Sequence, residues 1–358
     1  MRSPIPSRFG SSRISIWIRS DSRRSSAMPS PSRLRSPKRS VPHRRGDGAS
    51  GMTTIVTVAS GKGGVGKSVA VANLGLALAA LGRKVVLADL DVGGSNLSTL
   101  FGVFEEGPDL GAFLSREIEC LEDAARPIWK NLSLVVGAGE TLATANPNWG
   151  MKQRLLRHLL KLDAEIVLVD LGAGTGPHAL DFFNAGHLRI VVTVPEPTAS
   201  VDAYRLIKLA AVREAVVRVH SRNPVRRSIE RRDFSAAGDL WTLLDSTGAS
   251  RSDAPAASTP WLLSNRTGGT DAHFQRLHSV AKRFLGCELR SLGRIPEDPW
   301  VPDSVRRYLP VVEYRPSAPA SRAYRTAAGR LAALVDRADP GREPLLSSDP
   351  TPRATPGA

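Results

Sequence analysis

A glycine-rich octapeptide is the segment whose residue types and spacing indicate chemistry most directly. It matches the pattern G-x-x-x-x-G-K-[ST] and lies between a β-branched segment and an Ala/Leu-rich one. Glycines have no Cβ, so the backbone N–H groups can point inward and surround phosphate oxygens, and a following helix adds positive charge at its N-terminus. The sequence therefore predicts a phosphate-binding loop made of Gly61, Lys62, Gly63, Gly64, Val65, Gly66, Lys67 and Ser68.

The last two residues of this loop carry its predicted chemistry. Lys67 is placed to reach the β and γ phosphates, and the hydroxyl of Ser68 is placed to bind Mg²⁺. The expected ligands are ATP and Mg²⁺. Lys62 is a second lysine inside the loop, and phosphate binding does not require it because Lys67 already does that.

Acidic residues end two other apolar segments of the chain. We expect Asp89 to hold a water of the Mg²⁺ shell, and Asp91, two residues later on the same strand face, to orient the attacking water. Capping of the following helix is the alternative role for each. Asp170 ends the apolar run Ile-Val-Leu-Val, where a bare charge needs a partner such as Mg²⁺-bound water. The predicted metal-binding residues are thus Ser68, Asp89 and Asp170.

The elements that must position these residues alternate along the chain. We expect strands at 53–59, 84–89, 132–136, 165–170, 189–194, 261–264 and 288–293. We expect helices at 68–81, 95–100, 151–162, 199–217, 272–285 and 321–337. This alternation predicts an α/β fold with a mainly parallel twisted sheet and helices on both faces. In such folds ligands bind at the carboxyl ends of the strands, where the acids and the glycine loop fall.

Composition divides the 358 residues into three parts. Residues 1–51 hold 12 Arg or Lys against two Asp, and so carry most of the net charge of +15. This Arg/Ser/Pro-rich tail is expected to be disordered. A transit peptide, a basic arm for nucleic acid or anionic lipid, and a start codon called too early remain open. Residues 52–338 are predicted to form the folded domain, with a polar insertion at about 218–259, and 339–358 to form a Pro-rich disordered tail.

Cysteine usage and hydropathy exclude several classes of protein. Cys120 and Cys287 are the only cysteines, and neither belongs to a CxxC pair, which argues against zinc, iron–sulfur and disulfide frameworks. No apolar run approaches the roughly 18 residues that span a bilayer. We therefore expect a cytoplasmic protein, with membrane-surface or nucleoid association as a further possibility.

The sequence Lys-Gly-Gly-Val-Gly-Lys-Ser at 62–68 resembles the deviant Walker A loop of the MinD/ParA superfamily of P-loop ATPases. In that family the extra lysine reaches across a dimer interface to the partner's ATP. The resemblance implies an ATP-dependent homodimer, with Lys62 joining Lys67 and Asp91 in catalysis. It also implies that the segment from Asp89 is switch I and that Gly172–Gly176 is switch II.

The resemblance covers about residues 53–337 and lies closest to the MinD and FlhG (FleN)-like branch. It implies that Asn265, at the end of its strand, reads the adenine edge, and that Arg266 and Pro296 lie beside the base. An ordinary turn asparagine is the alternative for Asn265. Two family features are absent, namely the N-terminal activator helix of FlhG and a basic amphipathic helix after Arg337.

Three functions are compatible with these residues. The favoured one is a slow ATPase that converts ATP and water to ADP and phosphate, dimerises with ATP, and is stimulated by an unknown activating protein. It would act in spatial regulation of a division site, flagellar number or cargo. The alternatives are a ParA-like partition ATPase that binds DNA non-specifically and a non-hydrolysing adaptor. The arginines of the insertion would serve DNA or lipid binding, or form a solvated helix face: Arg222, Arg226, Arg227, Arg231 and Arg232.

Overall fold

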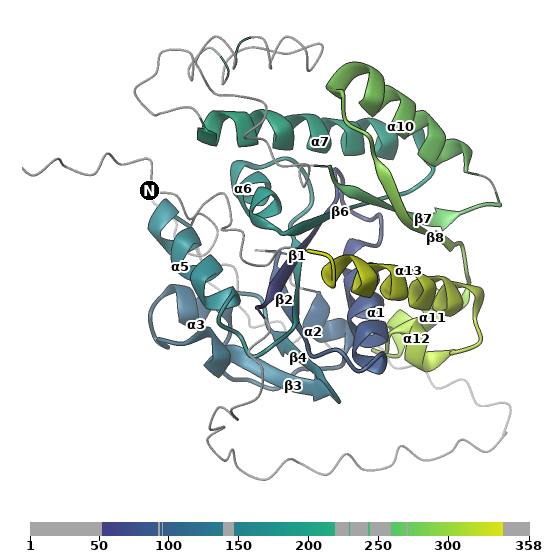
Figure 1. Ribbon diagram of the computed structural model, residues 1–358. Helices are drawn as coiled ribbons and strands as arrows, with labels where there is room; N and C mark the ends of the chain where they lie inside the picture. Colours follow the sequence, from purple (N-terminus) through teal and green to yellow (C-terminus); the bar gives the residue numbers. More distant parts are fainter. Residues whose placement is uncertain are drawn as a thin grey trace, which may run out of the picture. The chain divides into compact units, whose positions relative to one another are not determined.

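The computed structural model describes residues 52–91, 94, 96–138, 147–218, 229, 243, 259–269 and 271–338. These residues build a sheet with the strand order β3-β4-β2-β5-β1-β6-β7-β8 (Figure 1). Neighbouring strands are parallel except for β3 and β4, which are antiparallel. The strands are β1 (Thr54–Ala59), β2 (Val85–Leu90), β3 (Ala125–Trp129), β4 (Leu132–Val135), β5 (Ile166–Leu171), β6 (Leu188–Thr193), β7 (Trp261–Thr267) and β8 (Arg290–Pro296).

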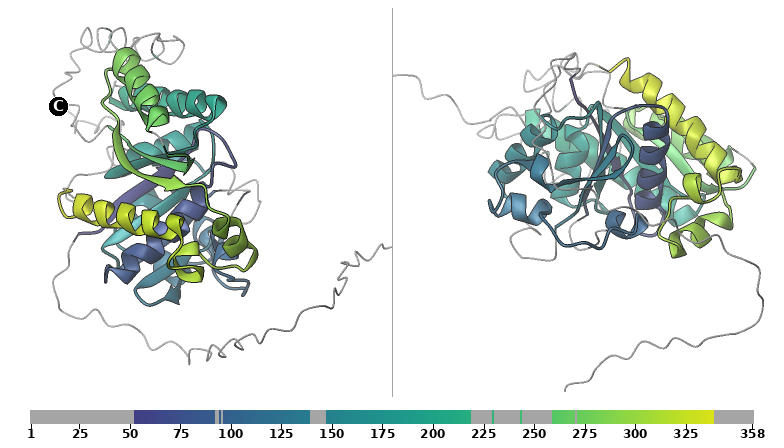
Figure 2. Two further views of the ribbon diagram at one scale, coloured as in Figure 1. Left: turned by 90° about the vertical axis from the view of Figure 1, so that its right-hand side faces the viewer. Right: turned by 90° about the horizontal axis from the view of Figure 1, so that it is seen from below.

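Helices cover both faces of this sheet (Figures 1 and 2). One face is packed by α1 (Lys67–Ala80), α2 (Leu97–Leu100), α11 (Trp300–Arg306), α12 (Val311–Tyr314) and α13 (Pro319–Val335). The other is packed by α3 (Leu110–Leu114), the 3₁₀ turn η1 (Leu121–Ala124), α5 (Trp149–Leu159), α6 (Pro177–Ala185), α7 (Pro197–Arg218) and α10 (Ala272–Leu285). The predicted fold class is confirmed.

The central strands are mostly apolar because both faces are covered. Every residue of β1 and of β5 is buried. Successive side chains point to opposite faces, so Val56 and Val58 join the core under α1, while Ile55 and Ala59 join the core under α6 and α7. Two hydrophobic cores, one on each face, therefore fix the register of the sheet.

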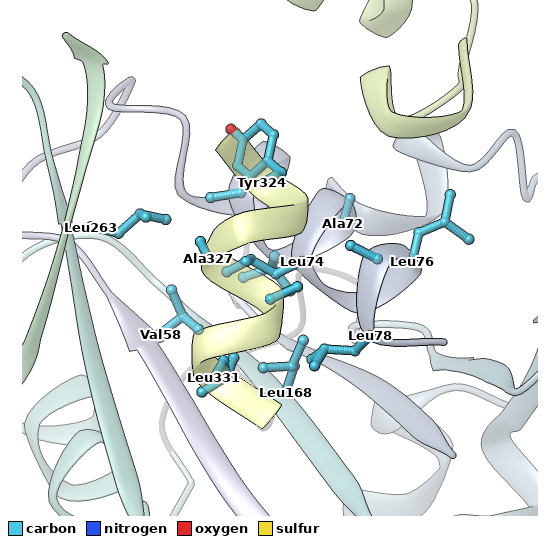
Figure 3. Close-up of a cluster of buried hydrophobic side chains, with 14 of the residues drawn as sticks. Val58, Ala72, Leu74, Leu76, Leu78, Leu168, Leu263, Tyr324, Ala327 and Leu331 are labelled. Carbon is cyan, nitrogen blue, oxygen red and sulfur yellow. The ribbon is translucent and has the colours of Figure 1, made fainter. Parts of the chain in front are cut away.

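Helix α1 is enclosed rather than amphipathic, which is why its sequence is almost entirely Ala, Leu and Val. It packs against strands β2 and β5 and against α2, α12 and α13, and Leu74 and Leu78 on it are fully buried. Figure 3 shows α13 crossing this region, with Leu331 directed toward Val58 and Leu168 on the strands. A helix that is apolar on all sides is expected in such a position.

Several short elements were not predicted from the sequence. They are β3, α3, α6, α11 and α12, and each is too short to show a clear period. β3 also contains Pro127, which has no backbone N–H and is tolerated because β3 is an edge strand. The predicted disordered tails lie outside the described residues, as does most of the polar insertion at about 218–259. Among the described helices, none is long and apolar enough to cross a membrane.

A buried carboxylate ties three helices together on the second face. Asp181 of α6 accepts from Lys152 Nζ of α5 at 2.7 Å and from Arg213 Nε of α7 at 2.7 Å. The side chains of Asp181 and Lys152 are 2% and 7% exposed. Burial favours a higher pKa for Asp181, but the hydrogen bonds and charges of Arg213 and Lys152 outweigh it and hold the pKa below its ordinary value.

We predict that Asp181→Asn lowers the free energy of unfolding at pH 7 by about 3 kcal/mol, because it leaves buried positive charge without a counter-charge. The folded-state pKa lies below the unfolded one, so the carboxylate's contribution is complete above about pH 4 and is lost as pH falls through the folded pKa. Urea unfolding of both proteins should therefore give a constant difference between about pH 5 and 7 and a smaller one below about pH 4.

Asp163→Asn is the matched control, because Asp163 is 73% exposed and pairs with Lys84 at the surface. It should change stability by less than about 1 kcal/mol. An Asp181→Asn difference that is as large at pH 3 as at pH 7 would contradict the stated role of the carboxylate.

Candidate nucleotide site

The predicted phosphate loop connects the end of β1 to the start of α1. Gly64 and Gly66 have φ angles of +77° and +83°, which side chains other than glycine rarely adopt. Gly66 is the N-cap of α1, and its carbonyl accepts from Ala70 N at 2.9 Å. A Cβ on Gly63 or Gly64 would meet no atom within 4 Å, so this side of the loop has room for a ligand.

Lys67 lies at the centre of the site, where the loop turns into α1. Its side chain is 6% exposed, and its Nζ lies 2.5 Å from Asp170 Oδ1 at the end of β5. A second carboxylate oxygen, Asp91 Oδ2, lies 3.4 Å away, beyond the end of β2. The structure therefore brings together three residues that are separated by up to 103 positions in the chain.

Asp170 is fully buried, and the loss of hydration is the main cause that raises its pKa to about 6. Lys67 opposes this shift and the nearby charge of Asp89 adds to it. The other oxygen, Asp170 Oδ2, is buried and has no hydrogen-bond partner within the part of the chain that the structure describes. The hydroxyl of Ser68 lies 3.5 Å from Lys67 Nζ, next to the same group. A buried carboxylate oxygen without a donor beside a hydroxyl suits a hard cation such as Mg²⁺.

Asp89 is also fully buried and is paired in register with Asp170 across β2 and β5. Its Oδ1 accepts from Asp91 N, and its Oδ2 accepts from the backbone N–H groups of Asn96 and Leu97, each at 3.1 Å. These hydrogen bonds hold the backbone between β2 and the start of α2. Asp89 thus has the helix-capping role that was its alternative in the sequence analysis. Its contact with the Mg²⁺ shell stays a prediction.

The predicted switch II segment lies against the same acids. A Cβ on Gly172 would lie 3.1 Å from Asp91 Oδ1, so a larger residue there would require a small shift of the Asp91 side chain. Gly174 has a φ of +98°, and its N–H donates to Ser60 O at 2.9 Å, immediately before the phosphate loop. The segment after β5 is thus hydrogen-bonded to the residue that precedes the phosphate loop and lies close to Asp91.

Lys62 contacts a segment to which sequence analysis assigned no role. Its Nζ donates to Glu196 Oε2 and to Thr198 Oγ1, both at 3.0 Å, in the connection from β6 to α7. The hydrogen bond and charge of Lys62 lower the pKa of Glu196. The side chains of Lys62 and Glu196 are 35% and 48% exposed. Nothing in the sequence Val-Pro-Glu-Pro-Thr at 194–198 specifies this partner.

Two of the three residues expected beside the base donate hydrogen bonds to the phosphate loop. Asn265 Nδ2 donates to Val65 O at 2.8 Å, and Arg266 Nη2 donates to Gly64 O at 3.1 Å. Pro296, the last residue of β8, is paired with Thr267 at the end of β7, next to them. The structure thus places Asn265 and Arg266 against the loop and Pro296 on the neighbouring strand, and the contact of all three with adenine stays a prediction.

Comparison with known proteins agrees with this geometry. Residues 51–219 match the family model described as "ParA: NUBPL iron-transfer P-loop NTPase". The chain carries a P-loop NTPase domain of the ParA family. Its relatives include MinD and FleN proteins, so the predicted membership of the MinD/ParA superfamily, on the FlhG-like side, is confirmed.

Individual relatives are moderately similar. A putative septum site-determining protein MinD of Chlorella vulgaris is 34% identical over 166 residues, which cover 46% of this chain and 58% of that protein. The flagellum site-determining protein YlxH of Helicobacter pylori is 35% identical over 44% of this chain and 54% of that protein. The chain thus spans little more than half the length of these two relatives. The antiactivator FleN of Pseudomonas aeruginosa is 27% identical over 77% of this chain and 85% of its own length.

Solved structures share the fold. MinD of Pyrococcus horikoshii, in complex with Mg-ADP, superposes with a TM-score of 0.57 at 24% identity, over 79% of this chain and 97% of that one. A ParA family ATPase of Chlorobium tepidum superposes with a TM-score of 0.56 at 17% identity, over 79% of this chain and 100% of that one.

We predict that Gly66→Ala destabilises the protein by about 2–4 kcal/mol. The left-handed backbone costs a side chain about 1–2 kcal/mol, and the new Cβ would lie 2.5 Å from Asn265 Nδ2, which breaks the hydrogen bond to Val65. Gly63→Ala is the matched control, because its Cβ meets no atom, and it should shift stability by less than about 1 kcal/mol. Urea unfolding without nucleotide measures both, and equal losses would contradict the argument.

Proposed function

We propose that this chain is an ATPase that converts ATP and water to ADP and phosphate and that works as a nucleotide-dependent dimeric switch. The observation that carries the proposal is the convergence of Lys67, Asp170 and Asp91 on the phosphate loop. These residues lie at the carboxyl ends of parallel strands, where open α/β sheets bind their ligands. The family membership of residues 51–219 supports the same activity.

Each residue of the site has a task in this reaction. The backbone N–H groups of Gly63–Lys67 and the ammonium of Lys67 bind the phosphates, and the carboxylates that now hold Lys67 give way to phosphate oxygens. Ser68, Asp170 and Asp89 hold Mg²⁺ directly or through its waters. Mg²⁺, when bound, offsets negative charge on the β and γ phosphates.

Asp91 orients the attacking water in the proposed reaction. It is 22% exposed, whereas Asp170 is fully buried, so Asp91 is the more accessible of the two carboxylates to an attacking water. Its close approach to Gly172 would also make its position sensitive to the segment after β5. Catalysis of phosphoryl transfer consists mainly of such positioning and electrostatic stabilisation.

Lys62 supplies the proposed link between nucleotide and dimerisation. Its partners Glu196 and Thr198 lie at the surface, so Lys62 can exchange them for a phosphate of a second subunit at little cost in desolvation. Two chains would then meet at the strand ends with ATP between them. Asn265, Arg266 and Pro296 would contact the base, and residues 52–338 would act as one ATPase domain.

The biological role that fits the relatives is spatial regulation. Proteins named for septum or flagellum site determination are among the relatives, and FleN is named an antiactivator. We propose that an activating protein stimulates slow hydrolysis here as well. Iron transfer, named in the matching family description, is not part of this proposal because Cys120 and Cys287 are far apart and belong to no CxxC pair.

Two substitutions separate binding from hydrolysis. Lys67→Ala should lower ATP affinity at least about 100-fold, because it removes a charge-assisted contact with phosphate. Asp91→Ala should preserve ATP affinity, because it removes only a competitor for Lys67, and should slow turnover about 10²–10⁴-fold. Fluorescent-nucleotide titration and phosphate release measure the two effects. Normal turnover by Asp91→Ala would exclude its proposed role.

Light scattering of the full chain tests the switch. In the Asp91→Ala background the mass should double with ATP and Mg²⁺ and stay unchanged with ADP. Adding Lys62→Ala should preserve ATP binding and leave a monomer. Lys84→Ala is the matched control, because Lys84 is also an exposed lysine in a surface ion pair, and it should still dimerise. A chain that stays monomeric with bound ATP would contradict the proposed dimeric switch. It would not contradict the proposed ATPase activity.

A further inference from the structure

A cavity lies at the opposite end of α1 from the phosphate loop. Its volume is about 310 Å³, and it is bounded by the last turns of α1, the β3–β4 turn and α12. Apolar side chains form its floor, with Leu76, Ala77 and Val312 nearly fully buried beneath it. Figure 3 shows Leu76 on α1, on the side away from Val58. The volume is at the lower limit for ligand pockets and suits one or two side chains.

The surface around this cavity is unusually apolar for an exposed position. Leu81, which follows α1, is 57% exposed, and Trp129 at the β3–β4 turn is 42% exposed. Charged groups stand at the rim, namely Lys130, Glu313 and Arg325. An apolar floor with a mixed-charge rim fits a short peptide segment that carries apolar side chains between charged ones.

The described chain ends beside this cavity. Asp336, at the C-cap of α13, forms an ion pair with Arg83, and Arg83 directly follows Gly82, which lines the cavity. The residues after Ala338 therefore start within a few residues' length of the rim. From Asp336 to Leu345 an extended chain reaches about 30 Å, which is ample.

The segment that follows has the matching composition. Leu345 and Leu346 are the only large aliphatic residues in 339–358, and Arg342 and Glu343 precede them. Pro344 restricts the backbone just before the leucine pair, so less conformational entropy is lost when the segment is ordered. Glu343 can pair with Lys130 or Arg325 at the rim, and Arg342 with Glu313.

We propose that residues 342–346 dock on this cavity in their own chain, with Leu345 and Leu346 covering Leu76, Ala77 and Val312. The segment then shields Leu81 and Trp129 and holds the end of α13 against α1. This contact is separate from the nucleotide site and does not depend on the proposed ATPase activity.

Hydrogen exchange of the full chain tests the contact. Leu345→Asp/Leu346→Asp should raise exchange several-fold at residues 76–82 and 129–131, because the cover is removed. Ser347→Asp/Ser348→Asp is the matched control, since it adds the same two charges next to the leucine pair, and it should leave exchange unchanged. Equal effects of the two variants, or no effect of either, would overturn the proposal.

Limited trypsin digestion tests the same contact by measuring the access of a protease to the docked segment. Docking should protect the bond after Arg342, whereas the bond after Arg353, beyond the docked segment, should be cut freely. Ala80→Arg places a bulky side chain at the exposed rim and should speed cleavage after Arg342 several-fold with cleavage after Arg353 unchanged. Cleavage after Arg342 that is as fast in the wild type as in Ala80→Arg would show that the cavity does not hold this segment.

Discussion

The constraint on which the rest of the structure depends is the burial of ionised groups at the carboxyl ends of the central strands. Asp170 is excluded from water, and the positive charge of Lys67 beside it offsets only part of the lost hydration, so the pKa of Asp170 stays raised. Such a pair is costly to maintain unless further charges complete it. Polyanions and cations from solution can therefore stabilise these buried charges. This property suits the ends of the strands to the proposed nucleotide site.

The strand order explains why residues so distant in sequence meet there. β1 lies between β5 and β6, β2 adjoins β5, and β7 adjoins β6, so the segments after five neighbouring strands converge on one edge. The loop after β1 supplies Lys67, β5 supplies Asp170, the segment after β6 supplies Glu196, and β7 itself supplies Asn265. The two cores that hold the helices on each face also hold these strand ends in place.

The sequence was sufficient for the features that have a strong local pattern. β1 and β5 are short β-branched and apolar runs, and α1 is an Ala/Leu helix after a glycine loop. Lys67 is a charge at the start of that helix, and Asp170 is a charge at the end of its strand. The partner of Lys62 could not be predicted, because Glu196 lies 134 residues away and its motif has no geometric signal. The short helices could not be predicted either, since tertiary contacts rather than period decide them. The sequence left two roles open for Asp89, and the structure was needed to show that it accepts hydrogen bonds from the backbone.

Pro127 has a consequence for how two chains can associate. It lies in β3 at one edge of the sheet and removes a donor that a strand from another molecule would need. At the other edge, β8 presents the exposed cations Arg290 and Arg294, which oppose a second copy of themselves. A continuous sheet running through two molecules is therefore disfavoured at both margins. The proposed dimer would therefore form at neither sheet edge, but at the rim that carries the phosphate loop.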